Sequence, residues 1–222
     1  MPCVRMIKIF ACIFMVTDHI GLVFFPDMPA LRLIGRLSMP LFAYCIARGF
    51  SSSRKRGTAE AYIKRMAVFA AVSQIPYMLM LRTVSGNIGV TWLLSLSILY
   101  LAEKHNKTKR DYLLIFALAV LSATLPFDYG IYGIGFAVIF YFFYVERYDR
   151  DKFFAGFIIL HLFLMAQDLT LGFIQVFTFP SILGLVLLQK HDGKVRITKK
   201  FFYAFYPLHM LCLVLIKLAI TR

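Results

Sequence analysis

The sequence predicts an all-α integral membrane protein, a polytopic bundle of about nine transmembrane helices that forms a single domain over residues 1–222. Hydrophobic residues make up 60% of the chain and charged residues only 16%, whereas soluble domains average about 45–50% and about 25%. The mean hydropathy is +0.75, and apolar runs recur from Met6 to the C-terminus. This composition excludes a cytosolic globular domain, a disordered chain and a disulfide-framed secreted domain.

The predicted helices follow from apolar runs that charged residues, prolines or glycines separate. A helix that crosses a membrane needs roughly 20 mainly apolar residues. The expected helices are 6–25, 31–50, 62–81, 88–102, 112–126, 131–145, 153–166, 171–188 and 201–220. The first run resembles a signal peptide. However, Asp18 and His19 interrupt it and no A-x-A cleavage site follows, so we expect this helix to be retained.

The basic residues predict how the helices are oriented. The formal net charge is +14, which in a soluble protein would indicate nucleic-acid binding. Here Lys and Arg form short clusters in alternate loops, as the positive-inside rule predicts, so we expect a lipid bilayer as partner and no nucleic acid. The N-terminus then lies in the cytoplasm and the C-terminus outside, in a bacterial plasma membrane. The outer loops are very short, so we expect the function to reside within the membrane.

Polar residues inside the predicted helices are the candidate functional residues, because ionisable groups in a bilayer are costly. Asp18 and His19 lie in the outer half of the first helix. Arg32 and Arg36, one turn apart, share a face of the second helix. His19, Arg36 and Gln74 each lie about 8–10 Å below the outer end of their helix, counted at 1.5 Å per residue.

Three further polar positions lie beside prolines that are expected to kink their helices. Tyr77 follows Pro76 in the SQIPY segment of the third helix, and Tyr206 and His209 flank Pro207 in the last helix. Together with Arg32, Arg36 and Gln74, these residues are our candidates for substrate binding.

Two interpretations of Asp18 and His19 remain open. In one, Asp18 pairs with Arg36 or Arg32 only to make buried charges tolerable. In the other, His19 transfers a proton, as an imidazole can near neutral pH. Adjacent helical residues point about 100° apart, so Asp18 is not expected to orient His19. No spacing of His or Cys supports a metal site, and none is predicted.

These residues resemble the TraX family, membrane proteins linked to N-terminal acetylation of conjugative pilin. The resemblance rests on MIKIFACIFMVTDHIG, LRLIGRLSMPLFAYCIARGF, SQIPY and FYAFYPLHM. The family is similar to the wider transmembrane acyltransferase group, which delivers acyl groups from cytoplasmic acyl-CoA to acceptors across the membrane. The resemblance implies that His19, with Asp18 beside it, is catalytic and that Arg32, Arg36 and His209 belong to the site.

The function expected from the resemblance is an acetyltransferase. Acetyl-CoA is the expected donor, and its phosphates would be attracted by the basic inner loops. The acceptor is an unknown amine or hydroxyl, such as a peptide N-terminus or a cell-surface polymer. Two alternatives stay open, namely a transporter or flippase for a small anionic substrate and a non-enzymatic assembly factor.

The orientation predicts the result of reporter fusions. Reporters at Arg54, Lys107 and Lys194 should report a cytoplasmic location, because these residues lie in the basic loops. Reporters at Asp27 and Asp128 should report an external location. A reporter at Lys194 that reads as external would contradict the nine-helix arrangement.

Overall fold

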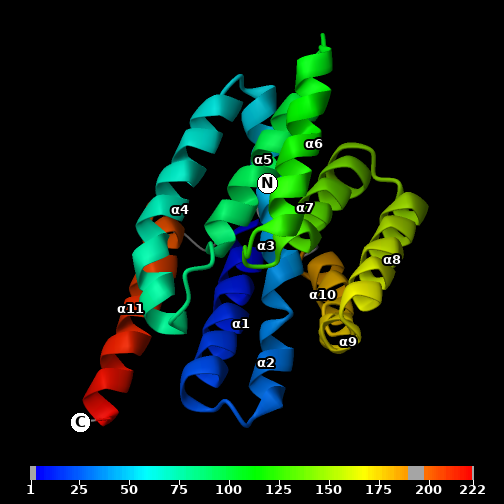
Figure 1. Ribbon diagram of the computed structural model, residues 1–222. Helices are drawn as coiled ribbons and strands as arrows, with labels where there is room; N and C mark the ends of the chain where they lie inside the picture. Colours follow the sequence, from blue (N-terminus) through cyan, green and yellow to red (C-terminus); the bar gives the residue numbers. More distant parts are fainter. Residues whose placement is uncertain (1–3, 190–197, 222) are drawn as a thin grey trace. The chain divides into compact units, whose positions relative to one another are not determined.

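The computed structural model describes residues 4–189 and 198–221, and the elements in these ranges are helical (Figure 1). By its internal contacts the chain divides into two compact units. The first unit comprises 1–45, 76–83 and 161–222, and the second comprises 46–75 and 84–160. The unit boundaries fall inside three long helices, α3 (Ser38–Lys55), α4 (Ala59–Leu81) and α8 (Arg150–Gln167).

The other helices each belong to one unit. In the first unit these are α1 (Val4–Phe24), α2 (Pro29–Gly35), α9 (Leu169–Val176), α10 (Phe179–Gln189) and α11 (Lys199–Ile220). In the second they are α5 (Ile88–Ala102), α6 (Lys109–Thr124), α7 (Gly130–Ile139) and the π-helical segment η1 (Phe140–Glu146).

Two of the predicted helices are divided. The expected helix 31–50 is interrupted between α2 and α3, and the expected helix 171–188 is interrupted between α9 and α10. The first interruption begins at Arg36, four residues before Pro40, and the second begins at Phe177, directly after the residue four before Pro180. A proline has no N–H for the carbonyl four residues earlier and its ring collides with that carbonyl, so the helix ends there.

The lengths of the helices support a membrane location. Among the described residues, three stretches are long and apolar enough to cross a membrane: Arg5–Phe24, Pro29–Lys55 and Lys200–Ile220. The apolar helices Ile88–Ala102, Gly130–Glu146 and Gly172–Leu185 are shorter. Nine crossings, and their orientation, therefore remain a prediction. The basic loop that contains Lys194 lies outside the described residues.

Apolar side chains line the outer faces of several helices. On α4, Val68, Val72 and Ile75 are 63%, 59% and 68% exposed, and their spacing places them on one face. On α8, Ile159 and Leu162 are 66% and 59% exposed. Water-soluble proteins rarely expose contiguous apolar surface of this kind, whereas a lipid environment accommodates it.

The first and last helices, α1 and α11, run parallel in the first unit (Figure 1). Near their starts the Lys8 ammonium lies 5.3 Å from the centre of the Phe202 ring. Further along, His19 of α1 contacts His209 of α11. Two helices that cross a membrane in the same direction require an odd number of crossings from the first to the last, as the predicted arrangement has.

Two glycines allow α1 and α2 to approach closely. A Cβ atom on Gly35 would overlap the Asp18 side chain, and one on Gly21 would lie 2.7 Å from Cβ of Leu31. Contacts this short do not occur between real side chains. The glycines of the DHIG and RLIGR segments thus set the distance between these two helices.

The Gly35→Ala variant should therefore be less stable. The added methyl group collides with Asp18, and overpacking of this kind costs about 1–3 kcal/mol. The matched control is Gly184→Ala on α10, where an added Cβ meets nothing within 4 Å. Thermal unfolding of both variants in detergent measures the difference, and equal melting temperatures would contradict the close packing of α1 on α2.

Candidate active site

Asp18 of α1 lies between two arginines from the α2 segment. Its Oδ2 accepts a hydrogen bond from Nη1 of Arg32 at 2.6 Å, and its Oδ1 lies 3.4 Å from Nη2 of Arg36. The side chains of Asp18 and Arg36 are only 14% and 12% exposed, whereas Arg32 is 31% exposed. We call these three residues the carboxylate cluster. In an apolar helix pair each charge needs such a partner, because an unpaired buried charge is very costly.

His19 contacts the last helix. Its Nδ1 lies 2.7 Å from Nε2 of His209, within hydrogen-bonding distance. The two ring planes are parallel and their centroids are 5.0 Å apart. The N–N distance is little more than half the distance between the centroids, so the two nitrogens lie on the facing edges of the two rings. We call these two residues the histidine pair.

The surroundings of His209 hold its ring in place. Its Nδ1 lies 2.9 Å from the carbonyl oxygen of Phe205, one turn earlier in α11. The Phe205 ring stacks on it with centroids 5.3 Å apart. The buried Tyr206 ring lies edge-on, 5.7 Å from His209 and 6.5 Å from His19. Edge-to-face and stacked contacts at these distances are favourable for aromatic rings.

The carboxylate cluster and the histidine pair are joined through α1. Asp18 and His19 are neighbours in the chain, and successive helical side chains diverge by about 100°. Asp18 accordingly contacts α2, whereas His19 contacts α11. The arrangement places two cations, a carboxylate and two imidazoles around one turn of α1.

Gln74 and Tyr77, the other binding candidates, lie in different units. Gln74 belongs to the second unit, where its Oε1 accepts from the backbone and side-chain amides of Asn87 at 3.1 and 2.7 Å. Its Nε2 donates to the Ser85 carbonyl at 2.8 Å. The amide therefore fastens the turn between α4 and α5. Tyr77 is buried in the first unit at 4% exposure, and its binding role stays a prediction.

His161 is a buried histidine whose ring is hydrogen-bonded within the first unit. It is 4% exposed, and its Nε2 lies 3.2 Å from the Gln175 carbonyl oxygen and 3.1 Å from Oγ1 of Thr178. Thr178 lies at the interruption between α9 and α10, where helix ends leave backbone carbonyls without helical donors. The Gln175 carbonyl also accepts from the N–H and the hydroxyl of Thr178, so His161 joins α8 to the hydrogen-bonded turn between α9 and α10.

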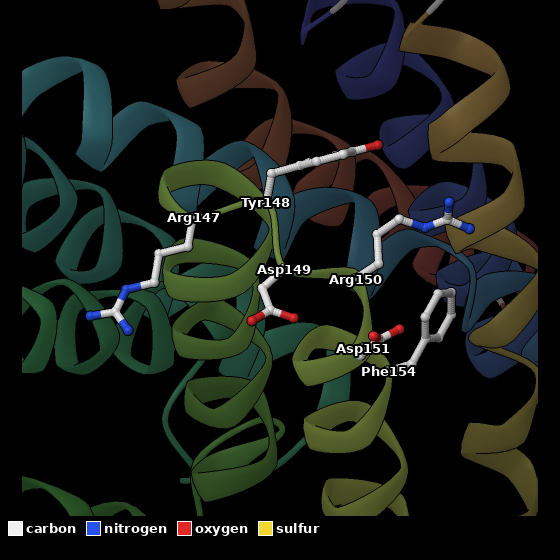
Figure 2. Close-up of a pocket in the computed structure, with 6 residues that line it drawn as sticks. All are labelled: Arg147, Tyr148, Asp149, Arg150, Asp151 and Phe154. Carbon is white, nitrogen blue, oxygen red and sulfur yellow. The ribbon is translucent and has the colours of Figure 1, made fainter.

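An open hollow lies at the turn between η1 and α8 in the second unit, but its charged groups do not converge (Figure 2). Figure 2 shows Arg147 and Arg150 pointing to opposite sides of the turn. Asp149 is engaged by Lys152, with Oδ2 2.7 Å from its Nζ. The bond to Lys152 lowers the pKa of Asp149. This hollow therefore does not form a candidate active site.

The geometry of the histidine pair does not suit a metal ion. Two nitrogens that bind one zinc ion at about 2.0–2.1 Å in tetrahedral geometry are about 3.3 Å apart, whereas these nitrogens are 2.7 Å apart. Within residues 4–189 and 198–221, no group of three or more His, Cys, Asp or Glu side chains could hold a metal.

Comparison with known proteins identifies the family. The family described as TraX protein matches residues 4–217. This chain belongs to the TraX family. It is 28% identical over 234 residues to the probable fimbrial assembly protein FimC, serogroup H1, of Dichelobacter nodosus, over 92% of this chain and 91% of that protein. An uncharacterized protein of Rickettsia prowazekii (strain Madrid E) is 34% identical over 70 residues, which cover 32% of this chain and 25% of that protein.

No solved structure matches the chain. The family and its apolar helices identify a membrane-associated protein related to a fimbrial assembly protein.

The carboxylate cluster predicts a non-additive effect on stability. Asp18→Asn should lower the free energy of unfolding by roughly 2–4 kcal/mol, because it leaves two arginines without their carboxylate in a largely buried site. Asp18→Asn combined with Arg32→Gln should cost about 1–2 kcal/mol less than the sum of the two single variants. Unfolding in mixed detergent measures both, with the exposed Asp27→Asn as control. Strict additivity would show that Asp18 and Arg32 are not coupled.

Proposed function

We propose that this TraX family protein is an integral-membrane acyltransferase. Most simply, it is an acetyltransferase that moves the acetyl group of cytoplasmic acetyl-CoA to an amine or hydroxyl at the outer side of a bacterial plasma membrane. The observation that carries the proposal is the hydrogen-bonded histidine pair beside the carboxylate cluster. Acyl transfer needs a group that accepts a proton and groups that stabilise negative charge, and an imidazole and guanidinium groups can serve these purposes.

His19 serves as the base in this proposal. It accepts the proton that the acceptor amine or hydroxyl loses as its nitrogen or oxygen bonds to the thioester carbonyl carbon. The carbonyl oxygen becomes negatively charged, and the C–S bond to CoA then breaks. The CoA thiolate leaves with the proton that His19 took up, so the base is restored. Such proton transfers contribute about 10²–10⁴-fold to rate.

The arginines stabilise the negative charge that develops on the carbonyl oxygen. Guanidinium groups are always charged and carry five N–H donors. Arg32 is the better placed of the two, because its side chain is 31% exposed whereas that of Arg36 is 12% exposed. Asp18 holds both groups in position, so in this proposal it acts on catalysis through the arginines.

A membrane-spanning arrangement lets the donor and the acceptor reach the site from opposite sides. The basic clusters of the inner loops would attract the phosphates of acetyl-CoA. The parallel packing of α1 and α11 supports the odd number of crossings that places the two termini on opposite sides.

The name of the Dichelobacter relative suggests the acceptor and one alternative. That protein is described as a probable fimbrial assembly protein, so the N-terminal amine of a pilin-like subunit is the acceptor we propose first. The same name favours a non-enzymatic assembly factor as the second candidate. The two differ in one respect, because only the enzyme transfers acetyl groups from acetyl-CoA.

The test is acetyl transfer by the purified protein in lipid nanodiscs. The protein should consume radiolabelled acetyl-CoA and label a pilin-like peptide with a free N-terminal amine, but not the same peptide with a blocked N-terminus. His19→Ala and His19→Gln should insert normally and lower the transfer rate by about 10²–10⁴-fold. The rate of the wild type should rise with pH, because the neutral imidazole is the base.

The control variant is His105→Ala, since His105 is exposed in the loop between α5 and α6. Inserted protein and transfer rate are measured on the same preparations. Full turnover in a well-folded His19→Ala protein would overturn the catalytic role of His19. No consumption of acetyl-CoA by the wild type with any amine or hydroxyl acceptor would favour the assembly factor.

A further inference from the structure

The hydrogen bonds of the histidine pair define which ring nitrogens carry protons. A carbonyl oxygen can only accept a hydrogen bond, so Nδ1 of His209, which lies 2.9 Å from the Phe205 carbonyl, must donate. A neutral imidazole has one N–H and one acceptor nitrogen. Nε2 of a neutral His209 is therefore an acceptor.

The same reasoning extends to His19. Its Nδ1 lies 2.7 Å from the acceptor Nε2 of His209, so it must be the donor of this bond. The proton of a neutral His19 is thus on Nδ1, and its lone pair is on Nε2. In histidine generally, the tautomer is set by the hydrogen bond that the other nitrogen makes.

We infer that His209 is a positioning residue that fixes His19 in the Nδ1–H tautomer and so makes Nε2 of His19 the nitrogen that accepts the proton. The chain of bonds runs from His19 through His209 to the Phe205 carbonyl. This inference rests on the proposed function for its catalytic consequence, but the tautomer itself is a property of the protein that can be measured without any substrate.

The arrangement also favours the protonated form of His19 during the reaction. When Nε2 takes up a proton, Nδ1–H still donates to His209, now from a charged ring. Hydrogen bonds from charged donors are roughly twice as strong as neutral ones. The positive charge is partly shared along the chain toward the Phe205 carbonyl, while no proton has to leave His209.

Rings around the pair limit its rotation. The Phe205 ring stacks on His209 at an angle of 14°, and the Tyr206 ring lies edge-on to both imidazoles. A ring flip of His209 would break its bonds to both His19 and the Phe205 carbonyl. The orientation of His19 therefore depends on α11 as much as on its own helix.

The test compares His209→Gln with His209→Asn. A Gln amide reaches the position of the imidazole Nε2, so its oxygen can accept from His19. An Asn amide reaches only the position of Nδ1, so it can bond to Phe205 but not to His19. The two variants have the same chemistry and differ by one methylene group, and His105→Gln serves as the control for loss of a histidine elsewhere.

Ring-nitrogen NMR of histidine-labelled protein in nanodiscs reports the tautomer. In the wild type and in His209→Gln, His19 should be protonated on Nδ1, whereas His209→Asn should show both tautomers. Acetyl transfer should fall by about 10–100-fold in His209→Asn without a matching change in KM, the range seen when groups that orient a metal-binding histidine are removed. His209→Gln should retain most of the wild-type rate.

The outcomes separate this inference from the proposed function. A wild-type His19 protonated on Nε2, or equal transfer rates in the Gln and Asn variants of an active enzyme, would overturn the inference and leave the acetyltransferase proposal standing. The expected tautomers in a protein that transfers no acetyl group would confirm the positioning by His209 and overturn the acetyltransferase.

Discussion

The placement of Asp18 against two arginines is the constraint on which the site depends. A carboxylate in an apolar helix pair is tolerated only when it is paired and hydrogen-bonded, and Arg32 and Arg36 supply both. The bonds fix the rotation of α1 relative to α2, and Gly35 allows the approach because a larger residue would overlap Asp18. Once α1 is fixed in this way, the direction of His19 toward α11 follows from helix geometry.

The fold was predictable where hydropathy alone decides it. The expected helix 88–102 coincides with α5, and the expected helices 6–25 and 201–220 correspond to α1 and α11. The interruptions at Arg36 and Phe177 were not predicted, although Pro40 and Pro180 follow them. Prolines gave no reliable signal, because Pro76 and Pro207 lie inside continuous helices. The surroundings of each proline decide whether the freed carbonyl finds another partner.

The candidate site was predictable in its local part only. Arg32 and Arg36 are one turn apart and follow Asp18 closely in the chain, so sequence reasoning could propose their pairing. The contact of His19 with His209 joins residues 190 positions apart. Nothing in the sequence around either residue indicates that the two are in contact. The FYAFYPLHM segment identified His209 as a candidate, but the hydrogen bond of its ring to the Phe205 carbonyl depends on the side-chain orientation in the folded helix. The sequence singled out Gln74 by its depth but did not indicate that its amide is hydrogen-bonded to Asn87 and Ser85, and its binding role stays a prediction.

The two interpretations of the polar residues in α1 concern side chains that contact different helices. The static interpretation describes Asp18, since its two oxygens contact Arg32 and Arg36. Without Asp18, these arginines would lose their carboxylate partner. The reactive interpretation concerns His19, whose ring is bonded to His209 on α11, and it stays a proposal. In the proposed function, the charged groups of the carboxylate cluster hold α1 against α2, and the imidazole of His19 is kept neutral for proton transfer. A bilayer favours this division, because a neutral imidazole places no charge in the apolar interior between turnovers, whereas a permanently charged group does.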